Sequence, residues 1–215
     1  MDFKLIDNII RFKLPRHPYD GRHQLYKKSD ITLIPGITTI IGCNGSGKST
    51  FVELLAKVIS TNTYGVSAVR SNLIDSKRFF ESADRAQKRI TELDKIVNRE
   101  IKSMMEWIDL FHFKTGVSII DDIDWLSVDN MLKLKYELNH TVIPYMRKKK
   151  HSEIFILIAT NRYEMCEGTH PFSVQDGNYI DIPDYDTYKK TILKTRRYCD
   201  RKIKQYHDVI NSVPQ

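Results

Sequence analysis

Short runs of apolar, β-branched residues alternate along this chain with segments in which apolar residues recur every three or four positions. The continuous runs are typical of strands buried on both faces and cover residues 37–41, 117–120 and 154–159. The three-to-four spacing predicts helices over residues 48–60, 129–139 and 185–211. Buried strands separated by helices indicate an α/β fold with a mostly parallel central sheet.

A β-rich preamble precedes the first buried run. Residues 3–12 and 31–34 read as strands, and a polar loop with Pro15, Pro18 and Gly21 joins them. Later in the chain, Gly177-Asn178 predicts a hairpin between 172–174 and 179–182. We therefore expect a β-hairpin-like start and a late hairpin around the parallel sheet.

The longest periodic segment is residues 81–111, where six apolar residues form one stripe of a helix roughly 45 Å long. They are Ile90, Leu93, Val97, Ile101, Met104 and Ile108. We interpret this helix as core-facing, with a short coiled-coil arm or dimer contact as the alternative. We expect one domain over 1–215, with a helical insertion at about 79–112 and a basic C-terminal helix at about 185–211.

Composition narrows the class of protein. With 215 residues, 41% hydrophobic and 28% charged, the chain is typical of an ordinary globular protein. No apolar run approaches the roughly 20 residues that cross a bilayer, and the N-terminus shows no leader pattern, so we expect a cytoplasmic protein without a membrane partner. Three cysteines without C-x-x-C spacing argue against a disulfide framework and a zinc site.

The candidate chemistry begins where the run 37–41 ends. The sequence Gly42-Cys43-Asn44-Gly45-Ser46-Gly47-Lys48-Ser49 matches G-x-x-x-x-G-K-[ST], the Walker A phosphate-binding loop, or P-loop. Glycines accept backbone angles that let consecutive N–H groups turn toward phosphate oxygens. Lys48 adds positive charge toward the β- and γ-phosphates, and the Ser49 hydroxyl is suited to Mg²⁺. We expect ATP to be bound by Gly42, Asn44, Gly45, Ser46, Gly47, Lys48, Ser49 and Thr50.

A P-loop needs an acidic partner at the end of a nearby strand. Asp121 directly follows the run 117–120 and is predicted to hold the Mg²⁺ shell, while Asp122 is the candidate to orient or deprotonate an attacking water. The alternative is that this pair of acids is a turn or helix-capping feature. Asp124 is interpreted as local capping.

Together these residues resemble the ATP-binding-cassette class of P-loop ATPases, in its soluble branch of DNA-repair, chromosome-maintenance and phage-defence ATPases. The loop with its Asn44 and Thr50 is similar to the usual G-x-N-G-S-G-K-S-T of that class. Residues 126–129 look like the segment that carries an Asp across the dimer interface. Asn161 falls where the class places a γ-phosphate-sensing His, and 176–180 resembles its late hairpin. The resemblance implies a homodimer with ATP at the interface.

Four positions depart from the class pattern. Asp122 replaces a catalytic Glu, Asn161 replaces the His, and no Gln lies between Ser49 and Ala86. The nearest match to the class signature is Ser82-Ala83-Asp84, where Asp84 stands in place of a glycine and would repel a γ-phosphate. These departures predict slow hydrolysis or a site that a partner completes.

The last helix is strongly basic, in a chain of net charge +7. Its eight cations are Lys189, Lys190, Lys194, Arg196, Arg197, Arg201, Lys202 and Lys204. We interpret it as a docked helix with a solvated basic face, and sequence-independent contact with nucleic-acid phosphates is the alternative. Residues 147–150 add a second basic run.

The sequence thus predicts an ATP hydrolase with Lys48, Asp122 and Asn161 as catalytic residues, Ser49 and Asp121 as metal ligands, and ATP-dependent dimerisation, in nucleic-acid maintenance or phage defence. Two alternatives stay open. One is a P-loop kinase acting on a nucleotide or small molecule, with Arg78, Arg85 and Arg89 in its lid. The other is a nucleotide-gated interaction module with a protein partner and little hydrolysis.

Overall fold

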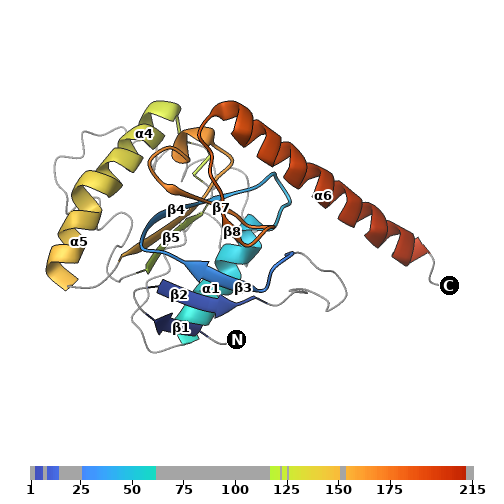
Figure 1. Cartoon of the computed structure of the whole chain (residues 1–215), viewed down its shortest axis with the longest axis horizontal. Helices are drawn as coiled ribbons and strands as arrows, with labels where there is room; N and C mark the ends of the chain where they lie inside the picture. The colour runs from blue at the N-terminus through green and yellow to red at the C-terminus, as the bar shows by residue number, and fades with distance from the viewer. Residues whose placement is uncertain are drawn as a thin grey trace, which may run out of the picture.

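A five-stranded sheet with its strands in the order β5-β6-β4-β7-β8 forms the centre of the protein (Figure 1). The computed structural model describes residues 3–6, 9–14, 26–61, 117–121, 123–124, 126–150 and 154–211. The strands are β4 (Gly36–Ile41), β5 (Val117–Asp121), β6 (Phe155–Ala159), β7 (His170–Ser173) and β8 (Asn178–Tyr179). All neighbours are parallel except β7 and β8, which form the predicted late hairpin. The expected α/β fold with a mostly parallel sheet is confirmed.

The register of the sheet brings three strand ends to one level. Ala159 of β6 pairs with Ile40 of β4 on one side and with Asp121 of β5 on the other. The P-loop strand and the acid-bearing strand are therefore not neighbours, because β6 lies between them. Adjacent strands are about 4.8 Å apart, so the two ends are separated by about 10 Å.

The preamble is a separate three-stranded antiparallel sheet of β1 (Phe3–Ile6), β2 (Ile9–Lys13) and β3 (Asp30–Leu33). The prediction of one strand over 3–12 was wrong, because Ile6 pairs with Ile9 and the chain folds back on itself there. The turn-favouring residues Asp7-Asn8 separate the two strands in the sequence. The hairpin-like character of the preamble is confirmed.

Helix α1 (Lys48–Thr61) lies between the two sheets. Its buried residues Phe51, Val52 and Leu55 share one core with inward-facing residues of both sheets. Tyr26, just before β3, is fully buried against Phe51, with ring centroids 6.2 Å apart. Tyr26 is therefore a core aromatic, and Tyr19, the other aromatic of the preamble, lies outside the described residues.

The opposite face of the main sheet is covered by α4 (Val128–Glu137), a π-helical turn η2 (Leu138–Val142) and α5 (Ile143–Lys150). The strand residues alternate between the two cores: Ile156 and Ile158 face this side, and Leu157 faces α1. The predicted helix 129–139 therefore continues further than expected. Proline usually ends a helix because it has no N–H to pair. Pro144 does not end this one, because the wider π turn before it has already interrupted the regular hydrogen-bond ladder.

Helix α6 (Tyr185–Asn211) has the predicted bounds and docks at the carboxyl edge of the sheet. The Asp184 carboxylate caps it by accepting a 2.7 Å hydrogen bond from the Thr187 N–H. Tyr188, Thr195 and Cys199 are buried against the body, and beyond them α6 runs outward toward the C-terminus (Figure 1). In the described part of the chain, no helix is both long and apolar enough to cross a membrane.

Candidate nucleotide-binding site

The P-loop lies between the end of β4 at Ile41 and the start of α1 at Lys48. Gly45 and Gly47 have φ angles of +78° and +90°, a region that side chains with a Cβ rarely adopt. Tyr26 steadies the loop, since its hydroxyl donates to the Gly47 carbonyl at 3.2 Å. The loop therefore directs the N-terminus of a 14-residue helix toward its own concave side, which suits an anion.

Gly42 and Ser46 are packed against each other across this loop. A Cβ at Gly42 would lie 2.3 Å from the Ser46 Oγ and 3.1 Å from its Cβ. Ser46 is fully buried, and its hydroxyl has no hydrogen-bond partner in the described structure. The first glycine of the motif is therefore required by the Ser46 side chain as well as by a ligand.

The ammonium of Lys48 donates to at least three acceptors among the described residues. It donates to the Gly42 carbonyl at 2.9 Å, the Cys43 carbonyl at 3.3 Å and the Asn161 Oδ1 at 2.7 Å. An ammonium has three N–H donors, so these contacts match its full capacity. A phosphate oxygen that binds Lys48 must therefore replace at least one of them.

Asn161 follows β6 and connects the P-loop to the acidic side of the site. Its Nδ2 donates to the Asn44 Oδ1 at 2.8 Å and to the Asp124 Oδ2 at 2.6 Å. Its backbone N–H points at both Asp124 carboxylate oxygens, at 2.9 and 3.1 Å. Both ends of the amide are thus engaged, and the predicted residues Asn44, Lys48 and Asn161 are brought together.

Two residues that support Asn161 were missed by the sequence reasoning. Asp124, interpreted as local capping, instead accepts hydrogen bonds from Asn161 and from the Thr160 hydroxyl, across 37 and 36 residues. Tyr188 of α6 donates its hydroxyl to the Asn161 carbonyl. Burial and the nearby acidic groups raise the pKa of Tyr188, which keeps this hydroxyl protonated as a donor. Neither role has a local sequence signal, because both depend on how distant segments meet.

The predicted metal ligands lie on the expected elements. Ser49 is exposed in the first turn of α1, and Asp121 ends β5 level with the end of β4. The described residues contain no group of three or more His, Cys, Asp or Glu that could hold a metal by themselves. Ser49 and Asp121 both offer oxygen atoms, the ligands of Mg²⁺, which is bound by one or two protein oxygens together with phosphates and waters.

Several predicted residues lie outside the described part of the chain. They are the water-positioning Asp122, the signature candidate Ser82, the long helix 81–111 and the lid arginines Arg78, Arg85 and Arg89. In the segment compared with a dimer-crossing loop, Ser127 caps α4 by accepting from the Asn130 N–H at 3.3 Å. Asp129 is exposed in the first turn of that helix.

Helix α6 also reaches the P-loop through its cysteine. The Cys199 Sγ lies 3.8 Å from the Cys43 Sγ and accepts from the Gln175 Nε2 at 3.1 Å. Burial raises the pKa of Cys199 to about 11, and the adjacent Cys43 adds to the shift. Both cysteines are buried and free, so Cys43 packs the P-loop against α6.

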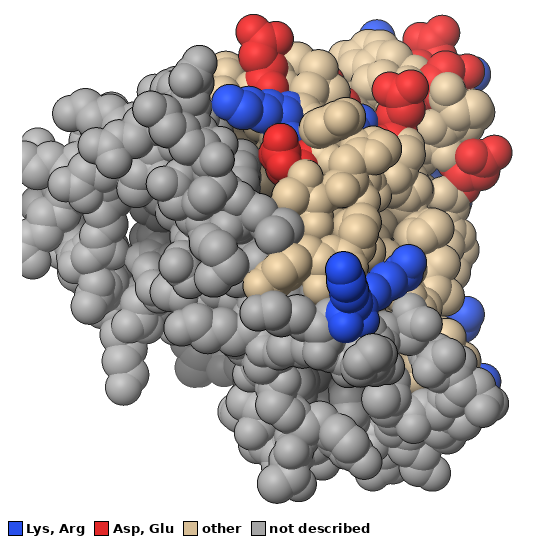
Figure 2. Space-filling model, turned by 90° about the vertical axis from the view of Figure 1, so that its left-hand side faces the viewer, with Lys and Arg blue, Asp and Glu red and all other residues tan. Residues whose placement is uncertain are grey.

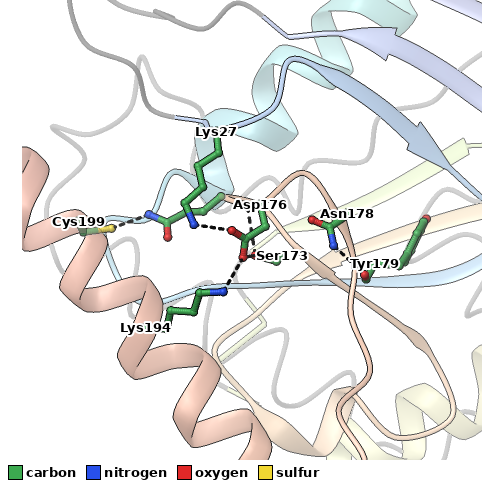
Figure 3. Close-up of polar contacts among 8 residues, drawn as sticks. Lys27, Ser173, Asp176, Asn178, Tyr179, Lys194 and Cys199 are labelled. Carbon is green, nitrogen blue, oxygen red and sulfur yellow. Dashed lines mark hydrogen bonds and ion pairs between the residues drawn. The ribbon is translucent and has the colours of Figure 1, made fainter.

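The carboxylate of Asp176 connects α6 to the β7–β8 hairpin and to the segment just before β3 (Figure 3). Asp176 lies 2.5 Å from the Lys27 Nζ and 3.9 Å from the Lys194 Nζ, and it accepts from the Ser173 hydroxyl at 3.0 Å. Partial burial acts to raise the pKa of Asp176, but the hydrogen bonds from Lys27 and Ser173 and the two ammonium charges outweigh it and lower that pKa.

The parallel sheet, the P-loop after β4 and the acid at the end of β5, one strand away, define an α/β P-loop ATPase. The sequence model of the family described as "ATPase family associated with various cellular activities (AAA)" matches residues 38–170, more than half of the chain, and the chain belongs to this family. No curated protein sequence matches the chain. The expectation of a P-loop ATPase is confirmed, whereas AAA is a different group from the cassette class that the motifs resemble, so that finer resemblance is not confirmed.

Proposed function

We propose that this chain hydrolyses Mg-ATP and that Asn161 reports whether a γ-phosphate is present. The observation that carries this proposal is the three-acceptor arrangement around Lys48, in which one acceptor is the Asn161 side chain. A γ-phosphate that takes the Lys48 ammonium releases the Asn161 Oδ1. Loss of that phosphate after hydrolysis restores the contact, so the end of β6 responds to the state of the nucleotide.

Each residue has a defined part in this proposal. The P-loop N–H groups and the α1 N-terminus bind the β-phosphate, and Lys48 neutralises charge that develops on the transferred phosphoryl group. Bound Mg²⁺, with Ser49 and Asp121 in its shell, supplies further positive charge to the phosphate oxygens. Asp122 orients the attacking water, and Asp124 holds the Asn161 amide so that its oxygen faces Lys48.

The test is release of inorganic phosphate from Mg-ATP by the purified chain, with Lys48→Ala as the inactive variant. Lys133→Ala is the matched control, because Lys133 is an exposed lysine on α4 away from the P-loop. Turnover that Lys48→Ala abolishes and Lys133→Ala preserves supports the proposal. Turnover that both variants retain, or that neither wild type nor control shows, contradicts it.

We further propose, in line with the cassette resemblance, that ATP drives formation of a homodimer. Support comes from α4, where Val128, Leu132 and Tyr136 are exposed at four-residue spacing and so form one apolar stripe. The stripe begins at Val128, which lies in the segment 126–129 that resembles a dimer-crossing loop. A contiguous exposed apolar patch is a feature of protein interaction surfaces.

Sedimentation velocity of Asp122→Asn with and without Mg-ATP tests the dimer, because blocked hydrolysis would trap the ATP-bound state. A dimer that requires ATP, disappears in Lys48→Ala and is abolished by Leu132→Glu supports the proposal. Leu193→Glu is the matched control, since Leu193 is an equally exposed leucine on α6. A chain that binds ATP and remains monomeric contradicts dimerisation.

The same measurements separate the two remaining candidates. A kinase would release little inorganic phosphate, and it would form ADP and a phosphorylated product only when an acceptor nucleotide or small molecule is added. An interaction module would bind ATP, with a melting temperature raised by the ligand, and turn over far below roughly 1 s⁻¹.

A further inference from the structure

One side of α6 carries cations in a regular row. Lys190, Lys194, Arg197, Arg201 and Lys204 follow one another at intervals of four, three, four and three residues, which places them on one stripe of the helix. All five are exposed. The stripe covers 14 residue steps and is therefore about 21 Å long.

The acids near this cationic stripe neutralise little of it. On α6, Asp186 lies one turn before Lys190, and Asp200 pairs instead with Arg196, whose Nε is 3.1 Å away. From the neighbouring hairpin, Asp176 reaches Lys194 at 3.9 Å but is closer to Lys27, at 2.5 Å. The stripe therefore keeps a strong local excess of positive charge.

A second face of the molecule lacks this pattern. On the side seen in Figure 2, acidic side chains gather toward the upper edge, and basic side chains occur both among them and lower down. The described part of this face therefore mixes charges of both signs, whereas the five cations on α6 form one row.

We propose that the cationic stripe of α6 binds the phosphodiester backbone of duplex DNA without reading its sequence. Duplex DNA carries one negative charge per about 1.7 Å of axis, so a 21 Å row of five cations meets a dense line of phosphates. Lysine and arginine bind phosphates whatever the sequence, and the stripe contains no asparagine or glutamine, the side chains that read adenine.

Two observations favour duplex DNA over a membrane surface and over single-stranded nucleic acid. A membrane-surface helix must bury a continuous apolar face in lipid, but Tyr188 and Cys199 of α6 are packed against the body. The exposed apolar residues Leu193 and Ile203 are separated along the helix by charged residues and form no such face. A single-strand binder stacks bases on successive exposed aromatics, whereas in the described part of α6 only Tyr185, at its first residue, is a largely exposed aromatic.

The test is binding of a fluorescent 30-base-pair DNA duplex of mixed sequence to the full chain, by anisotropy over a range of salt concentrations. We expect log Kd to depend on log salt with a slope of about 4.5, since five phosphate contacts each contribute about 0.9. Arg197→Gln and Arg201→Gln should each weaken binding about tenfold near 100 mM salt and lower the slope by about 1.

Arg196→Gln is the matched control, because it removes one cation of the same helix that lies off the stripe and is paired with Asp200. All three arginines are exposed, so the melting temperatures of the three variants should stay at the wild-type value. Equal weakening in the control and the stripe variants would overturn the proposal, because binding would then follow total charge. Absence of duplex binding, or tighter stripe-dependent binding to single-stranded DNA or to phosphatidylserine vesicles than to the duplex, would also overturn it.

Discussion

The Lys48 ammonium lies 2.7 Å from the side-chain oxygen of Asn161, although 113 residues separate them in the sequence. This contact joins the P-loop to the end of β6, the strand that lies between the P-loop strand and the acid-bearing strand. The same amide also contacts Asn44 and Asp124. Asn161 is therefore the point at which the three parts of the candidate site meet.

Replacing Asn161 by alanine should lower the rate of ATP hydrolysis more than the affinity for ATP. Once the γ-phosphate has displaced it from Lys48, the amide lies beside the transferred group, and one lost hydrogen bond of about 1.4 kcal/mol in the transition state corresponds to a tenfold lower kcat. We expect about that decrease, with the Kd for ATP within threefold of wild type, from steady-state kinetics and nucleotide titration.

Asn178→Ala is the control for this variant, because Asn178 is an exposed asparagine whose side chain bonds only to the adjacent Tyr179 carbonyl among the contacts described. An Asn161→Ala enzyme with unchanged kcat and weaker ATP binding would show that the amide acts equally on ground state and transition state. The γ-phosphate-reporting role would then be wrong.

Tyr188→Phe tests whether α6 acts on the site through the Asn161 carbonyl. The substitution removes only the hydroxyl that donates this hydrogen bond and keeps the packing of the ring. We expect kcat to fall about threefold to fivefold and KM to change little, since Tyr188 positions Asn161 and touches no nucleotide itself. Tyr185→Phe, at a largely exposed position of the same helix, should behave as wild type.

Gly42→Ala should abolish nucleotide binding, because the new methyl group would lie 2.3 Å from the Ser46 Oγ and force the loop to move. Adding Ser46→Gly removes both of the closest opposing atoms, so the double variant should regain part of the ATP-induced rise in melting temperature. A single Gly42→Ala variant that binds ATP normally would contradict the tight packing of the loop. Ser46→Gly alone supplies the baseline for the double variant.

Asp176→Asn should destabilise the protein at neutral pH but not in acid. The pKa of Asp176 is lowered in the folded state, so its contribution is complete above the unfolded value of about 3.9 and is lost as the pH falls through the folded value. For a half-exposed ion pair we expect a loss of about 1 kcal/mol at pH 7. Urea unfolding at pH 7 and at a pH below the lowered folded pKa of Asp176 measures it, and a difference that stays constant with pH would contradict the assignment.

Local patterns were sufficient to predict the parallel sheet, α1, α6 and the P-loop. The continuous apolar runs determine which strands are buried, and the Gly42–Ser49 motif specifies its own strand, loop and helix without help from distant residues. The split of residues 3–12 into two strands was missed, because their alternating apolar residues fit one long strand as well as two short ones.

The supporting residues of the site could not be predicted in this way. Asp124 reaches Asn161 only because β5 and β6 are paired in register, and Tyr188 reaches it only because α6 packs on the edge of the sheet. A carboxylate three residues after a strand and a tyrosine in an apolar helix stripe are both ordinary in sequence. Their importance arises from tertiary contacts, which no spacing rule encodes.

The contacts of α6 with the P-loop, through Cys199 and Cys43, and with Asn161, through Tyr188, make undocking of α6 and loss of the nucleotide site parts of one opening event. A ligand that binds only the closed form makes such an opening rarer in proportion to its saturation. Amide protons of the docked first half of α6 should therefore exchange with solvent about 100-fold more slowly when ATP is present at about 100 times its Kd, which corresponds to about 2.7 kcal/mol. Nucleotide would in this way set the local stability of the helix that carries the cationic stripe.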